Sequence, residues 1–186
     1  VWQNLLITHI RDEDMINVQA AITALDLEWK ASSFRAGLVA CTGNAGCKYA
    51  ASNTKQNAMM LAEYLEERFE LDQPINIHLT GCHHSCAQHA IGDIGLIATK
   101  VEVEEEMVEG YHVLVGGRTG SDPKIGTQLF QSVSVDKLPQ TVGSIIEYYL
   151  ERRLPGQSFA DFAKDHAWNG EAVMLATESF STPGRD

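Results

Sequence analysis

The four cysteines of this chain stand in two tight pairs, and these pairs constrain the fold more than any other feature. Five residues separate Cys41 from Cys47, three separate Cys82 from Cys86, and 34 lie between the two pairs. Glycines accompany the cysteines and let the backbone approach a bound group closely. If all four thiols serve one site, the fold has to bring two distant loops together. The glycines concerned are Gly43, Gly46 and Gly81.

This pattern favours a four-thiolate site for an iron–sulfur cluster, because such clusters are held by cysteines from one tight loop and from a second segment. A four-cysteine zinc site remains an alternative, although its paired ligands are usually about two to four residues apart. Disulfides suit small secreted domains, whereas a chain of 186 residues can form a core without them.

The segment from Leu38 to Lys100 resembles the cluster-binding half of the siroheme-dependent nitrite and sulfite reductases. The resemblance runs through VACTGNAGCKYA and INIHLTGCHHSCAQHAIGDIGLIAT and continues to YHVLVGG. The Thr-Gly-Asn after the first cysteine is more similar to the assimilatory nitrite reductases. The resemblance implies a [4Fe–4S] cluster bound by all four cysteines and a siroheme whose iron shares one thiolate. By position, the cluster ligands are Cys41, Cys47, Cys82 and Cys86, and the shared, catalytic thiolate is Cys86.

The resemblance also implies further cofactor-binding residues: His84, Thr80, Asn44 and Arg118. His84 stands at the motif position whose side chain lies near the cluster in this family. Arg118 follows a glycine pair and is expected either to reach a siroheme carboxylate or to be an ordinary solvated arginine. The chain departs from the family at His83, where proline is common and would fix the backbone after a ligand.

Charge limits what this chain can bind. It has 14 lysines and arginines against 25 acidic residues, for a net charge of −11, which argues against nucleic acid or an anionic membrane as a partner. No apolar run approaches the roughly 20 residues needed to span a bilayer. No secretory signal is evident, so we expect a cytoplasmic protein. Siroheme and its anionic substrates require many basic groups, so the chain looks like a C-terminal portion that needs the N-terminal half of the enzyme.

The resemblance implies an oxidoreductase that takes part in the six-electron reduction of nitrite to ammonia. Reduction of sulfite to sulfide is the alternative within the same class. A stand-alone iron–sulfur electron-transfer module without siroheme is a second class of function. The implied electron donor is ferredoxin or a flavoprotein.

Hydrophobic periodicity predicts an α+β fold of α/β-like appearance, with a mixed sheet and flanking helices. Asn53 followed by Gln56 predicts the start of a helix. An acidic run at residues 104–106 predicts a solvated hairpin tip. The expected strands are 38–40, 75–79, 94–101 and 111–115, and the expected helices are 53–69, 136–153 and 158–166.

Three segments are expected along the chain. Residues 1–35 resemble the end of a ferredoxin-like repeat, with a buried strand at Leu5–Ile7 and a helix from Asp12 to Leu25. Residues 36–167 form the expected [4Fe–4S] and siroheme-binding domain. Residues 168–186 carry no motif and are expected to be a tail.

Overall fold

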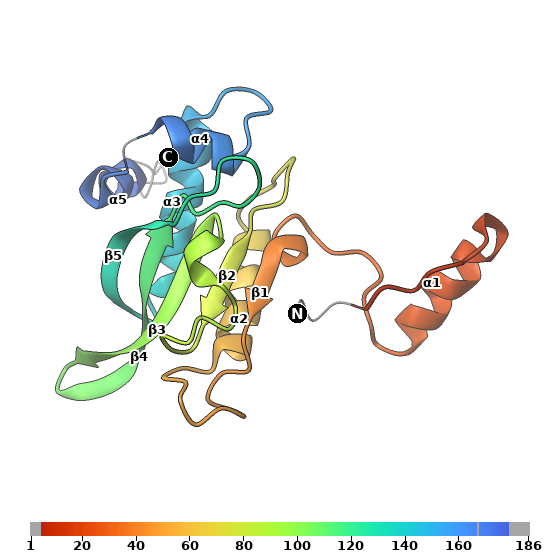
Figure 1. Ribbon diagram of the computed structural model, residues 1–186, viewed down its shortest axis with the longest axis horizontal. Helices are drawn as coiled ribbons and strands as arrows, with labels where there is room; N and C mark the ends of the chain where they lie inside the picture. Colours follow the sequence, from red (N-terminus) through yellow and green to blue (C-terminus); the bar gives the residue numbers. More distant parts are fainter. Residues whose placement is uncertain (1–4, 167, 179–186) are drawn as a thin grey trace, which may run out of the picture.

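A five-stranded mixed sheet organises the protein (Figure 1). The computed structural model describes residues 5–166 and 168–178. Strands follow one another across the sheet in chain order; β1, β2 and β3 are parallel, and β4 and β5 are antiparallel. The predicted mixed sheet is thereby confirmed, with one strand, β5, that the periodicity did not indicate. The strands are β1 (Leu38–Ala40), β2 (Ile77–Thr80), β3 (Ile94–Val103), β4 (Glu106–Val115) and β5 (Thr127–Ser134).

Helices flank this sheet, and Figure 1 shows α2 (Thr54–Glu66) and α3 (Leu138–Arg152) behind it. The side chain of Asn53 caps α2 by accepting from the backbone N–H of Gln56, as the sequence predicts. Ser158 likewise caps α4 (Phe159–Asp165) by accepting from the Asp161 amide. The caps satisfy backbone donors that a helix leaves unpaired in its first turn.

The core lies between these helices and the sheet. Leucines of α2 face the sheet at helical spacing, and α3 contributes a second apolar stripe beside them. Burial of this surface is the main favourable term in folding. The largest completely buried side chains include Leu61, Leu65, Leu79, Leu96, Tyr111, Ile145 and Phe162.

Strand β2 differs from its prediction, because all four of its residues are buried instead of every second one. The 3-10 turn η3 (His89–Ile91) contacts both β2 and the neighbouring strand β3. A Cβ added at Gly95 would lie 2.0 Å from the carbonyl oxygen of His89. Covering on both faces is typical of a parallel strand in the middle of a sheet.

The N-terminal segment does not form the predicted strand. Leu5 and Leu6 are 85% and 83% exposed, and residues 5–11 have no regular secondary structure. The helix α1 (Met15–Ala24) does form, but it has no buried residue and stands apart from the sheet in Figure 1. An apolar run becomes a buried strand only when a neighbouring strand pairs with it, and the described residues provide none here.

The predicted tail is wrong over residues 170–178, which form helix α5 (Gly170–Glu178) packed against α3. Asn169 accepts from the Glu171 amide at its start, and Val173 is completely buried. The aromatic ring of Trp168 stacks on Phe159 before the helix begins. The rest of the predicted tail, residues 179–186, lies outside the described residues. In the part of the chain that the structure describes, every helix is too short or too polar to span a bilayer.

Candidate metal centre

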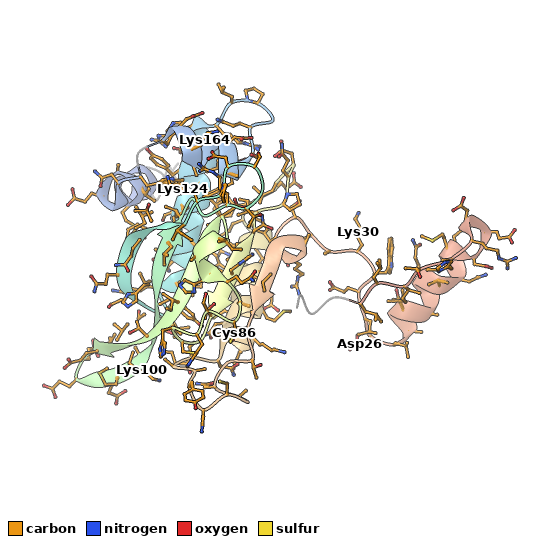
Figure 2. The ribbon with its side chains drawn as sticks, viewed as in Figure 1. Asp26, Lys30, Cys86, Lys100, Lys124 and Lys164 are labelled. Carbon is orange, nitrogen blue, oxygen red and sulfur yellow. The ribbon has the colours of Figure 1, made fainter. Side chains whose placement is uncertain are left out.

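Both cysteine pairs follow the carboxyl ends of neighbouring parallel strands. Cys41 comes directly after β1, and its backbone N–H donates to the carbonyl of Leu79 in β2. Cys82 follows β2 after a single residue, Gly81. Because β1 and β2 run parallel, the two loops start from the same edge of the sheet. In Figure 2, Cys86 marks this edge, toward the bottom of the view.

Gly81 connects the two loops. Its backbone N–H donates to Sγ of Cys41 at 3.1 Å, and its carbonyl accepts from the Ala51 amide at 2.8 Å. A Cβ at this position would lie 2.6 Å from Cβ of Ala50 and 3.4 Å from Sγ of Cys41. Only glycine lets the strand end pass this close to the first loop.

The first loop is a compact turn held by its own backbone. Gly43 has φ +68°, and its carbonyl accepts from the amides of Gly46 and Cys47. The hydroxyl of Thr54 donates to the carbonyl of Cys41 at 2.8 Å and also lies 3.6 Å from its Sγ. These contacts fix the backbone around Cys41.

The second loop uses left-handed backbone at two residues that are not glycine. Ser85 and Gln88 have φ near +55°, a conformation that costs energy for most residues. The Ser85 amide donates to the Cys82 carbonyl, and its hydroxyl hydrogen-bonds Nδ1 of His89. His83 lies in this tight turn, at the position where the nitrite and sulfite reductases that the chain resembles commonly have proline.

Histidine rings surround the second pair. Nδ1 of His84 lies 3.3 Å from Sγ of Cys82, and its ring is 5.2 Å from that of Tyr49 and 4.4 Å from that of His83. Burial, followed by the nearby His78, lowers the pKa of His89. The ring of His84 thus lies beside a cysteine side chain, while its expected contact with a cofactor stays a prediction.

All four cysteines are free thiols, and only Cys86 is exposed. Thiolates of a mononuclear zinc site all lie about 2.3 Å from the metal. Among the described residues, no three His, Cys, Asp or Glu side chains converge on a single ion in this way. The described side chains therefore do not form a mononuclear zinc site.

Thr80 gives a second sign that this edge fits a bound group. Its side chain is completely buried, and its Oγ1 has no hydrogen-bond partner in the described part of the chain. Buried hydroxyls without a partner are costly, so such a donor indicates an acceptor from outside the protein. The threonine lies one residue before Gly81, whose backbone N–H donates to Sγ of Cys41.

Asn44 and Arg118, two of the expected cofactor-binding residues, make polar contacts within the protein. The Asn44 amide donates to Oε1 of Glu109 at 2.8 Å. Arg118 follows β4 at the other end of the sheet, where it pairs with Asp122 at 2.8 Å and forms a β-bridge with Lys124. Figure 2 shows Lys124 far above Cys86. The structure therefore does not bring Arg118 to the cysteines, and its largely buried side chain is not an ordinary solvated arginine either.

Sequence reasoning missed a polar cluster on β4 that supports the first loop. Glu109 and Tyr111 point to the same side of β4, and both hydrogen-bond Ser52, while Asn57 of α2 completes the group. The alternation of β4 carried the signal, because Glu109 falls in register with the buried residues Tyr111 and Val113. A carboxylate on the core-facing register of a strand needs partners.

Comparison with known proteins fits this arrangement. Residues 32–168 match the family model described as the nitrite and sulphite reductase 4Fe-4S domain. The chain is 34% identical over 146 residues to a ferredoxin–nitrite reductase of Synechococcus elongatus, covering 78% of this chain and 28% of the relative. It is 35% identical over 169 residues to sulfite reductase (ferredoxin) 2 of Mycolicibacterium paratuberculosis, covering 87% and 30%.

Solved structures show the same fold. The NirA protein of Mycobacterium tuberculosis matches with a TM-score of 0.79 and 32% identity, over 87% of this chain and 31% of that one. A dissimilatory sulfite reductase I shares the fold alone, with a TM-score of 0.70 at 12% identity, over 95% of this chain and 61% of that one. The chain thus spans roughly three tenths of the length of its 30–35% identical relatives. With most of its length matched by the family model, the chain belongs to the nitrite and sulphite reductase 4Fe-4S domain family.

Proposed function

We propose that this chain is the cluster-bearing part of a siroheme-dependent nitrite reductase. The observation that carries the proposal is the pair of cysteine loops at one edge of the sheet, with all four thiols free. In this proposal a [4Fe–4S] cluster is bound by Cys41, Cys47, Cys82 and Cys86, with Cys86 shared with the siroheme iron. Its exposed side chain is the one suited to reach a second cofactor.

The protein's own contribution is to hold and tune the thiolates. The N–H of Gly81 donates to Sγ of Cys41 and so stabilises its negative charge. The unpaired hydroxyl of Thr80 supplies a further donor, and the ring of His84 lies against Sγ of Cys82. When bound, the cluster and siroheme would supply one-electron transfer and the iron at which the anion is reduced.

Substrate binding belongs to the remainder of a longer protein in this proposal. The chain has few basic residues for a site that binds an anion and a carboxylate-rich cofactor. The relatives that it matches are about three times longer than the matched part. We infer that the N-terminal half contributes most of the basic groups, and that ferredoxin or a flavoprotein delivers six electrons, one at a time, for each nitrite reduced to ammonia.

Reduction of sulfite to sulfide is the second candidate. The matched nitrite and sulfite reductases are nearly equally identical to this chain, at 34% and 35%. Both reactions need the same cluster and cofactor, and the anions are distinguished by residues on the substrate side. An electron carrier without siroheme is the third candidate.

The test is metal and cofactor analysis of the full-length protein purified without oxygen. Siroheme absorption bands with about five irons per chain, together with an EPR signal of the coupled centres, would support the proposal. About four irons without siroheme would favour the electron carrier, and zinc in place of iron would overturn the redox function. Turnover with nitrite and with sulfite, using a reduced dye, then distinguishes the two reductases.

A further inference from the structure

Glu109 lies on β4, on the side of the sheet that faces α2 and the first cysteine loop. Its cross-strand partner on β3 is Lys100, and Figure 2 shows Lys100 toward the same lower end of the molecule as Cys86. Neighbouring acidic residues of this hairpin, including Glu106, are exposed. Glu109 differs from them because it is half-buried and both of its carboxylate oxygens accept hydrogen bonds.

Four donors converge on this carboxylate. Oε1 accepts from the side-chain amide of Asn44 at 2.8 Å. Oε2 accepts from the hydroxyl of Ser52 at 2.8 Å, the backbone N–H of Asn53 at 3.0 Å and the side-chain amide of Asn57 at 3.2 Å. Hydrogen bonds to an ionised carboxylate are stronger than those between neutral groups.

These contacts hold the cysteine loop at its middle and in the segment just after it. Asn44 lies between Cys41 and Cys47, and its backbone N–H donates to the carbonyl of Ser52 at 2.9 Å. Ser52 is completely buried and also hydrogen-bonds the hydroxyl of Tyr111. The loop is thus shaped from outside itself, by a strand that lies 65 residues later in the chain than Asn44.

The same hydrogen bonds that position the Glu109 carboxylate also keep it ionised. Burial by itself would raise the pKa of this carboxyl, but the hydrogen bonds donated to it outweigh burial and lower its pKa below the usual value. The group is therefore ionised at neutral pH. A fixed negative charge near a cluster disfavours the addition of an electron, because net charge and hydrogen bonding set the potential.

We propose that Glu109 is a positioning residue for the cluster: it fixes the Cys41–Cys47 loop through Asn44, Ser52 and Asn53, and it adds a fixed negative charge that lowers the cluster's reduction potential. This inference rests on the proposed function, in which Cys41 and Cys47 of this loop are cluster ligands. It assigns a role to an acidic residue of a hairpin whose other acids are solvated.

Two substitutions separate position from charge. Glu109→Ala removes all four acceptor contacts, so we expect iron to be lost to a ferrous chelator roughly tenfold to a hundredfold faster than from the wild type. Glu109→Gln retains the contacts to Oε2, and a flip of the Asn44 amide lets the new amide donate to it. We expect Glu109→Gln to keep the wild-type rate of iron loss and to shift the cluster's potential, measured by EPR redox titration, to more positive values.

Glu106→Gln on the same strand removes an exposed charge and is the matched control. Should Glu109→Ala fail to fold, Asn44→Ala removes the Oε1 contact alone, and faster iron loss from it would support the proposal. Suppose that the wild type contains its full iron, but Glu109→Ala matches Glu106→Gln in both the rate of iron loss and the cluster's potential. That result would overturn the role of Glu109 and leave the cluster assignment standing. An iron-free wild type would overturn both.

Discussion

The backbone N–H of Gly81 donates to Sγ of Cys41 across 3.1 Å, which joins the carboxyl ends of two parallel strands through a cysteine side chain. The contact places the residue before Cys82 against the thiol of the first pair. Through this contact, two loops whose cysteine pairs are separated by 34 residues of sequence lie against each other.

We therefore expect Gly81→Ala to damage the site. The new Cβ would lie 2.6 Å from Cβ of Ala50, so one loop must move, at a cost of about 1–3 kcal/mol. Iron per chain after anaerobic purification and the thermal midpoint should both fall. The double variant Gly81→Ala/Ala50→Gly removes the clashing atom and should recover much of the iron; no recovery would show that the steric account is wrong.

Cys86→Ser in the full-length protein should uncouple the two centres of the proposed site. Cys86 is the exposed cysteine, and the other three are partly buried. We expect the EPR signature of coupling to disappear and nitrite turnover to fall at least about tenfold. Coupled spectra with full turnover in this variant would contradict the assignment of Cys86 as the shared ligand.

The ion pair between Arg35 and Glu66 should make stability depend on acid pH. Nε and Nη2 of Arg35 donate to the two carboxylate oxygens at 2.9 and 3.0 Å, and Ser32 donates a further hydrogen bond. Hydrogen bonding from Arg35, opposed by burial, lowers the pKa of Glu66 below its ordinary value of 4.5. The stabilisation is therefore complete above pH 4.5 and is lost as the pH falls through the lower pKa of the folded state.

Glu66→Gln should accordingly lower the unfolding free energy by about 1 kcal/mol at pH 7. Its difference from the wild type should shrink as the pH falls below 4.5. Chemical denaturation at a series of pH values measures both effects. Glu70→Gln, at an exposed position close by, is the control and should show no such dependence. A difference that grows in acid would refute the role of the ion pair.

Helix α5 should contribute to the stability of the domain. Val173 is completely buried against the core, so Val173→Ala should cost about 2 kcal/mol of unfolding free energy. Met174 is 39% exposed, and Met174→Ala should cost clearly less. Equal, negligible losses in both variants would mean that α5 does not pack as described.

Local patterns in the sequence were sufficient for several elements. Asn53 and Gln56 marked the start of α2. The acidic turn of the β3–β4 hairpin is exposed, as its composition predicts, with Glu104 and Glu105 both in left-handed conformation. Each of these features depends on residues close together in the chain, where capping and periodicity act directly.

The paired cysteines, read from the sequence alone, indicated the family to which the chain belongs. Only the tertiary structure decided what surrounds them: it placed Glu109 of β4 against Asn44 of the first cysteine loop, kept Arg118 at the far end of the sheet, and left Leu5–Ile7 without a strand partner. Strand pairing and buried hydrogen bonds join residues that are distant in sequence. Whether a carboxylate or an apolar run is buried therefore depends on a neighbour that its own segment does not specify.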